Sequence, residues 1–244
     1  MKLTIIGHWG GYPKLNEATT GYLLEHEGFK MLIDCGSAVF SAMQQFVLPE
    51  ELDAVIISHY HEDHVADIGV LQYSLLNGKY LGKKTGTLPI YGHLEDQMGF
   101  DRLSFRDITE GVVYHPDEIL QVGPFSIRFL KTKHPVPCYA MRIEAGNQVL
   151  VYTADSAFIH DFIPFSRDAD LLLCECNFYG DMNGEQAGHM TSYQAGEMAE
   201  GAKVKKLVLT HLPQFGEVEQ LKQEASERFS GEVELAALGL ALEL

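Results

Sequence analysis

The stretch "SHYHEDH" at residues 58–64 constrains this chain more than any other, because it sets three histidines and an aspartate within six positions. It overlaps the end of the apolar run "AVIIS" at 54–58, which is typical of a buried strand. His59 and His61 are two residues apart, so in extended chain their rings leave on the same side and can share one tetrahedral ion. We expect Asp63 and His64 to begin the following helix, where they face another direction and indicate a second ion nearby. The alternative, a polar solvated turn, is disfavoured beside a buried strand.

Other strand ends supply further ligand-type residues. His134 follows "SIRFLKTK", Asp155 follows "VLVYTA" and His211 follows "KKLVLT". Each histidine alone would be an ordinary surface or core residue, but together with the cluster at 59–64 they predict a two-metal site. Two cations roughly 3.5–4 Å apart hold a water between them and lower its pKa, which predicts hydrolytic chemistry. Histidines with carboxylates favour two zinc ions, with manganese or iron as alternatives.

The spacing of apolar runs predicts a single domain, residues 1–244, rich in strands. No Pro/Ser-rich linker or low-complexity segment divides the chain. Two segments resemble each other, 22–37 and 139–156, and each reads as a strand, a glycine turn and a strand ending in an aspartate and a serine, which suits a sandwich of two sheets. Helices are expected within 63–76 and at 192–202, the second starting with a capping box of Thr191 and Gln194. We expect strands at 2–6, 22–26, 29–34, 54–58, 88–92, 111–115, 125–131, 138–144, 148–153, 170–175, 206–210 and 233–237.

Charge and composition exclude several classes of function. The 34 acidic and 18 basic residues give a net charge of −16, which repels a long phosphate backbone. The beginning of the chain lacks a signal-peptide core, and no 18 apolar residues run together, so we expect a cytoplasmic protein with no membrane segment. The four cysteines lack zinc-site spacing and are interpreted as reduced core thiols.

These motifs resemble those of the metallo-β-lactamase superfamily, through H-x-H-x-D-H at 59–64 followed in order by His134, Asp155 and His211. The C-terminal third is most similar to ribonuclease Z and its relatives, in "CECNFYG" at 174–180, "GHMTSYQAGEMA" at 188–199 and "KKLVLTHLPQFG" at 205–216. The resemblance spans nearly the whole chain. It implies the four-layer αββα sandwich of that family, an α/β architecture with the metals at one edge between the sheets.

The resemblance also implies a role for each site residue. One ion would be bound by His59, His61 and His134, and the other by Asp63, His64 and His211, with Asp155 bridging. Asp63 would also take part in catalysis. Asp34, at a strand end, would orient the ligand loop or a ligand histidine, unless it only forms a turn.

A second pair of residues favours a phosphorus substrate. His189 in "GHMT" and Glu175 in "CECN" match the proton-delivery pair of ribonuclease Z relatives, which implies a protonated His189 held by Glu175 beside the scissile phosphate. The alternative is that His189 packs at the start of its helix and Glu175 is a strand-end charge. We therefore expect a dinuclear zinc phosphodiesterase.

Three departures from the family pattern limit the expected substrate. Only 20 residues separate His134 from Asp155, where ribonuclease Z carries its tRNA-binding arm. With the acidic charge, this favours a small phosphodiester or nucleotide-type substrate over tRNA. "GHWGGYPKLN" at 7–16 replaces the family's glycine-rich turn, so His8 and Trp9 either line the lip of the site or simply pack. "CECN" differs from the common His-Glu-Ala-Thr pattern.

The alternatives differ in the bond that is broken or in having no reaction at all. The nearest is a metal-dependent hydrolase of a lactone, β-lactam, thioester or sulfate ester. An iron redox protein is disfavoured because flavin-linked relatives generally have glutamate where this chain has His61, and a non-catalytic module is disfavoured because every ligand is retained. Assembly as a homodimer is left open.

Overall fold

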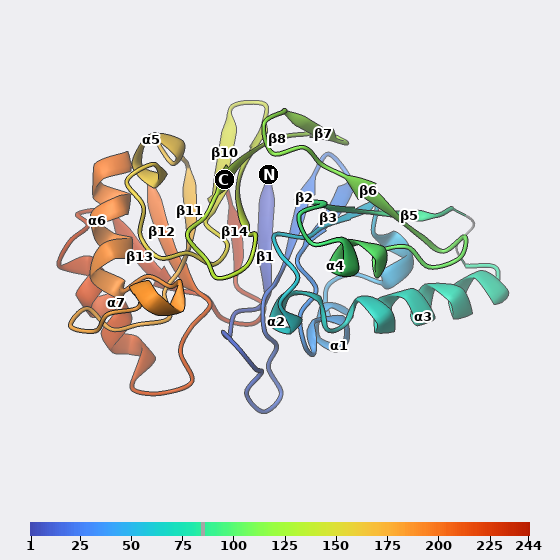
Figure 1. Cartoon of the computed structure of the whole chain (residues 1–244), viewed down its shortest axis with the longest axis horizontal. Coiled ribbons are helices and arrows are strands. Elements are labelled where there is room, and N and C mark those ends of the chain that lie inside the picture. Colours follow the sequence, from blue (N-terminus) through green and yellow to red (C-terminus); the bar gives the residue numbers. More distant parts are fainter. Residues whose placement is uncertain (84–85) are drawn as a thin grey trace. The chain divides into compact units, whose positions relative to one another are not determined.

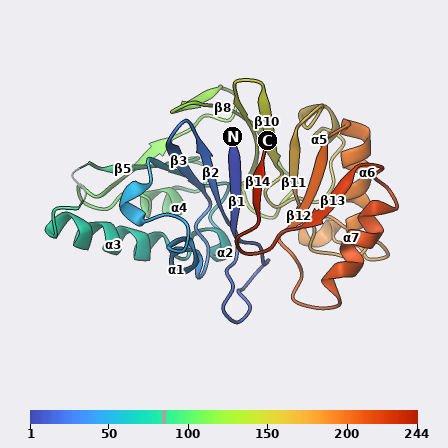
Figure 2. The same cartoon turned by 180° about the vertical axis from the view of Figure 1, so that it is seen from behind.

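The computed structural model describes residues 1–83 and 86–244, which divide into two compact units. The first unit comprises Met1–His115 and Ala237–Glu243, and the second comprises Pro116–Ala236 with Leu244. Figures 1 and 2 show the two units from opposite sides. That the whole chain forms one domain stays a prediction.

The first unit is built on a mixed sheet. Among the described residues, its seven strands lie in the order β14-β1-β2-β3-β4-β5-β6. The pairs from β14 to β3 are antiparallel, and those from β3 to β6 are parallel. The strands are β1 (Lys2–Gly7), β2 (Gly21–His26), β3 (Phe29–Ile33), β4 (Ala54–Ile56), β5 (Leu88–Gly92), β6 (Thr109–Val113) and β14 (Ala241–Glu243).

Helices of the first unit share an apolar core with its sheet. This buried cluster joins Val39 and Leu71 from helices with Leu23 and Val55 from strands. The helices are α1 (Val39–Met43), η1 (Pro49–Glu51), α2 (Glu62–Val65), α3 (Ile68–Tyr80) and α4 (Gln97–Asp101). The helix predicted within 63–76 is thus two helices. Between them, the Asp67 carboxylate accepts a hydrogen bond from the backbone N–H of Phe40 at 3.0 Å.

The second unit repeats this organisation. The described residues form seven strands in the order β13-β12-β11-β10-β9-β8-β7, antiparallel from β7 to β10 and parallel from β10 to β13. As Figure 1 shows, α6 and α7 run beside the parallel strands, with α6 against β11 and β12 and α7 against β13. The elements are β7 (Leu120–Val122), β8 (Phe125–Lys131), β9 (Tyr139–Ala145), β10 (Gln148–Tyr152), α5 (Phe162–Phe165), β11 (Leu171–Glu175), η2 (Glu185–Ala187), α6 (Ser192–Ala202), β12 (Lys206–Thr210), α7 (Val218–Ser226) and β13 (Glu232–Leu235).

The repeat noticed in the sequence corresponds to two equivalent hairpins. The hairpin of β2 and β3 turns at Gly28, with φ of +84°, and that of β9 and β10 turns at Gly146, with φ of +59°. In each unit the second hairpin strand is followed by three parallel strands. Because the carboxyl ends of parallel strands share one sheet edge, the loops that follow them gather there, where α/β sheets commonly bind ligands.

Most predicted elements are confirmed. All twelve predicted strands occur, with ends shifted by a few residues at most, and α6 starts with both bonds of the Thr191–Gln194 capping box. The short edge strands β7 and β14 and four α-helices were not predicted. The four cysteines are free and buried, as expected. No helix in the described part of the chain is both long and apolar enough to cross a membrane.

Candidate metal centre

The ligand-type residues of the first unit follow β4 in a short loop and the first turn of α2. His59 Nε2 lies 3.1 Å from His61 Nδ1, and His64 Nε2 lies 3.7 Å from Asp63 Oδ2. Two ligand atoms bound at about 2.1 Å to one tetrahedral ion are about 3.4 Å apart, so both distances suit a shared ion. The loop therefore presents two pairs of ligand atoms, as the spacing predicted.

Asp34, directly after β3, holds this loop in place. Its carboxylate accepts hydrogen bonds from Ser58 N at 2.8 Å, Ser58 Oγ at 2.8 Å and His64 Nδ1 at 2.9 Å. Because Ser58 Oγ donates to Asp34, it can accept from His59 Nδ1, 3.1 Å away. Both histidines thus have Nδ1 beside an oxygen acceptor, which leaves Nε2 for a metal. The orienting contacts predicted for Asp34 are confirmed.

Tyr60, which stands between His59 and His61 in the sequence, anchors the ligand loop to neighbouring segments. Tyr60 donates a hydrogen bond from its hydroxyl to His93 O at 2.8 Å, and burial raises the pKa of that hydroxyl. Its ring packs so closely on Gly99 that a Cβ there would lie 2.3 Å from Tyr60 Cγ. The glycine is therefore required by packing, and the sequence alone gave no sign of this contact.

The N-terminal loop at 7–16 contacts one of the predicted ligands through its backbone. Gly11, with φ of +76°, donates its N–H to Asp63 Oδ2 at 2.8 Å. His8 and Trp9 are both buried, and Trp9 Nε1 donates to Glu17 at 2.5 Å while Lys14 Nζ lies 3.7 Å from the centre of the Trp9 ring. Burial lowers the pKa of His8 from 6.5 to about 4. His8 and Trp9 are therefore packed inside the first unit, which is the second of the two alternatives given for this loop.

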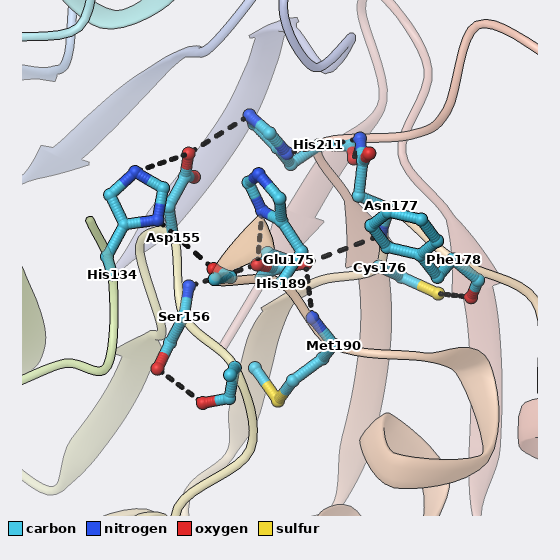
Figure 3. A network of polar contacts seen from close by, with 12 residues as sticks. His134, Asp155, Ser156, Glu175, Cys176, Asn177, Phe178, His189, Met190 and His211 are labelled. Atoms are coloured by element: carbon cyan, nitrogen blue, oxygen red, sulfur yellow. Dashed lines mark hydrogen bonds and ion pairs between the residues drawn. The ribbon is translucent and has the colours of Figure 1, made fainter. Parts of the chain in front are cut away.

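In the second unit, two histidines face one carboxylate. His134 Nε2 lies 3.9 Å and His211 Nε2 lies 3.3 Å from Asp155 Oδ2, and Figure 3 shows the carboxylate between the two rings. His134 follows β8, Asp155 follows β10 and His211 follows β12. This arrangement is the one expected if Asp155 bridges two ions, each also bound by one histidine.

A backbone carbonyl contacts one of these two histidines, and a side-chain amide contacts the other. His134 Nδ1 donates to Gly188 O at 3.1 Å, so its Nε2 is the atom that faces Asp155. Asn177 Nδ2 donates to the backbone oxygen of His211 at 3.0 Å and lies 3.4 Å from its Nδ1. Sequence reasoning missed both partners, because a carbonyl carries no residue signature and Asn177 appeared only as a departure from a family motif.

Glu175 and His189 form the predicted pair. Glu175 ends β11 fully buried, and its Oε1 accepts from His189 Nδ1 at 2.8 Å and from Ser156 N at 3.0 Å. Its Oε2 accepts from Met190 N at 3.1 Å and Asn177 N at 3.3 Å. These four donors offset the cost of burying a carboxylate. Figure 3 shows His189 standing over Glu175 with its other nitrogen directed away from it.

The His189 ring lies among the other histidines of the second unit. Ring centres are 5.1 Å apart for His189 and His211 and 5.3 Å apart for His189 and His134. His189, Glu175 and His211 also have ligand-type atoms within 4.8 Å of one another. The position of His189 therefore allows either proton transfer beside the ligands or ligation itself.

Left-handed backbone occurs at three of the strand ends that position the site. Asp34, Ala154 and His211 adopt left-handed conformations, with φ of 56°, 51° and 52°. Each follows a strand of its sheet, and such conformations in residues other than glycine concentrate at functional sites. These strand ends thus carry left-handed backbone as well as ligand-type residues, while six other described non-glycine residues with positive φ lie elsewhere in the chain.

The donor set suits zinc. In both units the atoms presented are imidazole nitrogens and carboxylate oxygens, which bind zinc well. The first unit brings together four predicted ligands, and the second brings together three predicted ligands and the Glu175–His189 pair. The first-unit residues are His59, His61, Asp63 and His64, and the second-unit residues are His134, Asp155, Glu175, His189 and His211.

Comparison with known proteins gives the relationships of the chain. A family model described as the β-lactamase superfamily domain matches residues 30–212. The probable metallo-hydrolase YhfI of Bacillus subtilis is 53% identical over 243 residues, covering 100% of both chains. Its crystal structure matches 100% of this chain and 99% of its own with a TM-score of 0.99, which confirms the fold class predicted from the sequence.

More distant relatives carry more specific names. Ribonuclease Z of Methanopyrus kandleri is 27% identical over 266 residues, covering 93% of this chain and 92% of its own. A diphosphatase of the PhnP family is similar in structure, with a TM-score of 0.79 at 17% identity and coverage of 100% of this chain and 97% of its own. At that identity the likeness concerns the fold alone.

Proposed function

Because the chain belongs to the metallo-β-lactamase superfamily and is related to its ribonuclease Z-like members, we propose that this metallo-hydrolase is a phosphodiesterase with two zinc ions. One ion would be held by His59, His61 and His134 and the other by Asp63, His64 and His211. Asp155 would bridge them. Support comes from the paired donor atoms within each unit and from the oxygen partners that leave Nε2 of His59, His64 and His134 for a metal.

The observation that carries the choice of phosphorus is the partly buried hydrogen bond between His189 Nδ1 and Glu175 Oε1, at 2.8 Å. Bound cations would lower the pKa of water and polarise a phosphoryl oxygen. Glu175 fixes the imidazole and stabilises its protonated form. His189 Nε2 can then contact a phosphoryl oxygen or give a proton to a departing alkoxide, which a poor leaving group needs.

The substrate would be small. The interval between His134 and Asp155 holds only β9, β10 and the turn at Gly146, so it has no room for an RNA-gripping arm. The net charge of −16 also opposes a polyanion. A cyclic or linear diester of nucleotide type fits both features.

The test uses His189→Ala on two phosphodiesters that differ only in leaving group. We expect the variant to keep its metal, because His189 lies outside the proposed ligand set. For an alkyl leaving group kcat should fall roughly 10²- to 10⁴-fold, the range for loss of a positioned general acid. For p-nitrophenolate, which needs little protonation, the fall should be distinctly smaller. Glu175→Gln should follow the same pattern more weakly.

Other outcomes would change the assignment. Loss of metal in His189→Ala would make that residue a ligand, in the grouping with Glu175 and His211. Unchanged kcat on both diesters would remove the main support for phosphorus. Turnover of nitrocefin, a lactone or an aryl sulfate above that of bis-p-nitrophenyl phosphate would then favour the alternative hydrolases.

A further inference from the structure

A cavity of about 390 Å³ opens beside His189 within the second unit. Its size falls at the lower end of the range of about 300–1,000 Å³ for small-molecule sites. The side chains that matter for recognition are those of Phe158, Met182, Asn183, Glu185, His189 and Gln194. None of these residues belongs to the proposed metal ligands. The cavity adjoins the proposed reaction centre through His189, and the proposed function does not yet give it a role.

Two carboxamides in this lining are held by their oxygens. Asn183 Oδ1 accepts from the backbone N–H of Glu185 at 3.0 Å, and Gln194 Oε1 accepts from the backbone N–H of Thr191 at 3.0 Å. A backbone N–H needs an acceptor, so these bonds also fix which end of each amide is oxygen. Within the described residues, no acceptor binds either NH₂ group. Each amide thus keeps a donor for a ligand.

The other side chains that line the cavity do not suit a phosphate group of the substrate. Apart from His189, the lining contains no basic side chain, and Glu185 adds a carboxylate whose partner is Lys133 at 2.6 Å. Phe158 supplies an aromatic ring and Met182 a thioether, which favour flat, polarisable groups. A neutral planar ring with acceptor atoms at its edge fits this combination, as nucleobases fit carboxamides elsewhere.

We propose that this cavity binds the base of a nucleoside leaving group, with Asn183 and Gln194 donating to its edge. The proposal rests on the proposed phosphodiesterase function, because it places the departing nucleoside next to the residue that protonates it. Phe158 and Met182 would contact the ring. The substrate class becomes diesters in which the alcohol released is a nucleoside.

The test measures binding of adenosine, which has the base but no phosphate, to the metal-loaded protein by calorimetry, with ribose as the matched ligand. Asn183→Asp and Gln194→Glu each keep the oxygen that accepts the backbone N–H and remove the NH₂ donor. Glutamate also suits a capping box, so α6 should keep its start. Gln186→Glu is the control, because it adds the same charge to the same exposed segment outside the cavity lining.

We expect adenosine to bind the native protein more tightly than ribose, and each cavity variant to weaken it roughly 2- to 12-fold, the effect of one lost hydrogen bond. Gln186→Glu should bind like the native protein. Equal affinity for ribose and adenosine, or equal affinity in all variants, would overturn the proposal. If bis-p-nitrophenyl phosphate is cleaved while the adenosine pattern is missing, only the base site fails. If the pattern appears without diester cleavage, the base site stands and the phosphodiesterase assignment fails.

Discussion

The histidine rings of this site are held by two kinds of hydrogen-bond partner. Two rings contact uncharged oxygen atoms, and two contact carboxylates. Ser58 Oγ lies beside His59 Nδ1, and the carbonyl of Gly188 accepts from His134 Nδ1. Such contacts select one imidazole tautomer and leave the other nitrogen for a metal. The carboxylate of Asp34 plays the same role for His64, and that of Glu175 fixes His189, whose other nitrogen is proposed to face the substrate.

Replacing Asp155 by alanine should remove metal from the protein and abolish hydrolysis. Both His134 Nε2 and His211 Nε2 face its Oδ2, so its loss removes a group proposed to touch both ions. Elemental analysis after reconstitution measures the effect, with the exposed Asp181→Ala as control. Full occupancy of both sites in Asp155→Ala would remove this residue from the bridging role.

His8 should make folding stability depend on pH. Burial lowers the pKa of His8 from 6.5 to about 4, so between these values the unfolded chain binds more protons than the folded one. The contribution of neutral His8 is therefore complete above pH 6.5 and is lost as the pH falls towards 4, to a total of roughly 3 kcal/mol. His8→Phe should lack this dependence.

The measurement is the free energy of unfolding by denaturant for both proteins across that pH range. The difference between native protein and His8→Phe isolates the effect of His8 from that of every other group in the chain. Parallel stability curves would show that His8 is not buried as a neutral ring.

At the scale of elements, the strand ends that carry the ligand-type residues could be predicted from the sequence. The contacts that hold the following loops in place could not. Short continuous apolar runs located β3, β4, β10, β11 and β12, and ligand-type residues after them located the site. Tyr60 against Gly99 and Gly11 against Asp63 join segments far apart in sequence, so local patterns hold no trace of them. The helix predicted within 63–76 was wrong at Asp67, because that side chain binds the backbone of Phe40, a tertiary contact.

Gly99→Ala should displace the ligand loop. The added Cβ would lie 2.3 Å from Tyr60 Cγ, and Tyr60 stands between His59 and His61. Overpacking of this kind costs about 1–3 kcal/mol of stability, and the moved loop should bind metal more weakly. Denaturant unfolding and metal content measure the two effects.

Gly69→Ala is the matched control, because its Cβ would meet nothing within 4 Å in α3. That variant should keep its metal and gain up to about 1 kcal/mol of stability from helix propensity. Native metal content in Gly99→Ala would show that the Tyr60 ring can move aside without disturbing the loop.

For the whole molecule, the proposed substrate class rests on charge and loop length more than on the ligand residues. The β-lactamase superfamily fold and the ligand pattern could be predicted because motif spacing is specific for them. The preference for phosphorus was predicted through the Glu175–His189 pair. The cavity beside His189 was not predicted, because its lining comes from segments around 158, 183 and 194. Gln194 stood out in the sequence only as part of a capping box, and Phe158 and Asn183 carry no signal there.

Small phosphodiesters should be cleaved with kcat/KM equal to or above that for precursor tRNA. The reason is the short hairpin between His134 and Asp155 together with the net charge of −16. Competition assays at two salt concentrations compare the substrates. Efficient, site-specific trimming of tRNA 3′ ends would show that another surface replaces the arm.

The central claim is that two metal ions act together on a phosphodiester, and a metal titration of the metal-free protein tests it most directly. Zinc is added in steps while bound metal per chain and turnover of bis-p-nitrophenyl phosphate are measured on the same samples. We expect binding to saturate at about two ions per chain, because the proposed ligands form two shells that share Asp155. Turnover should rise mainly with the second ion. Saturation at one ion, or full turnover with one ion bound, would contradict the account.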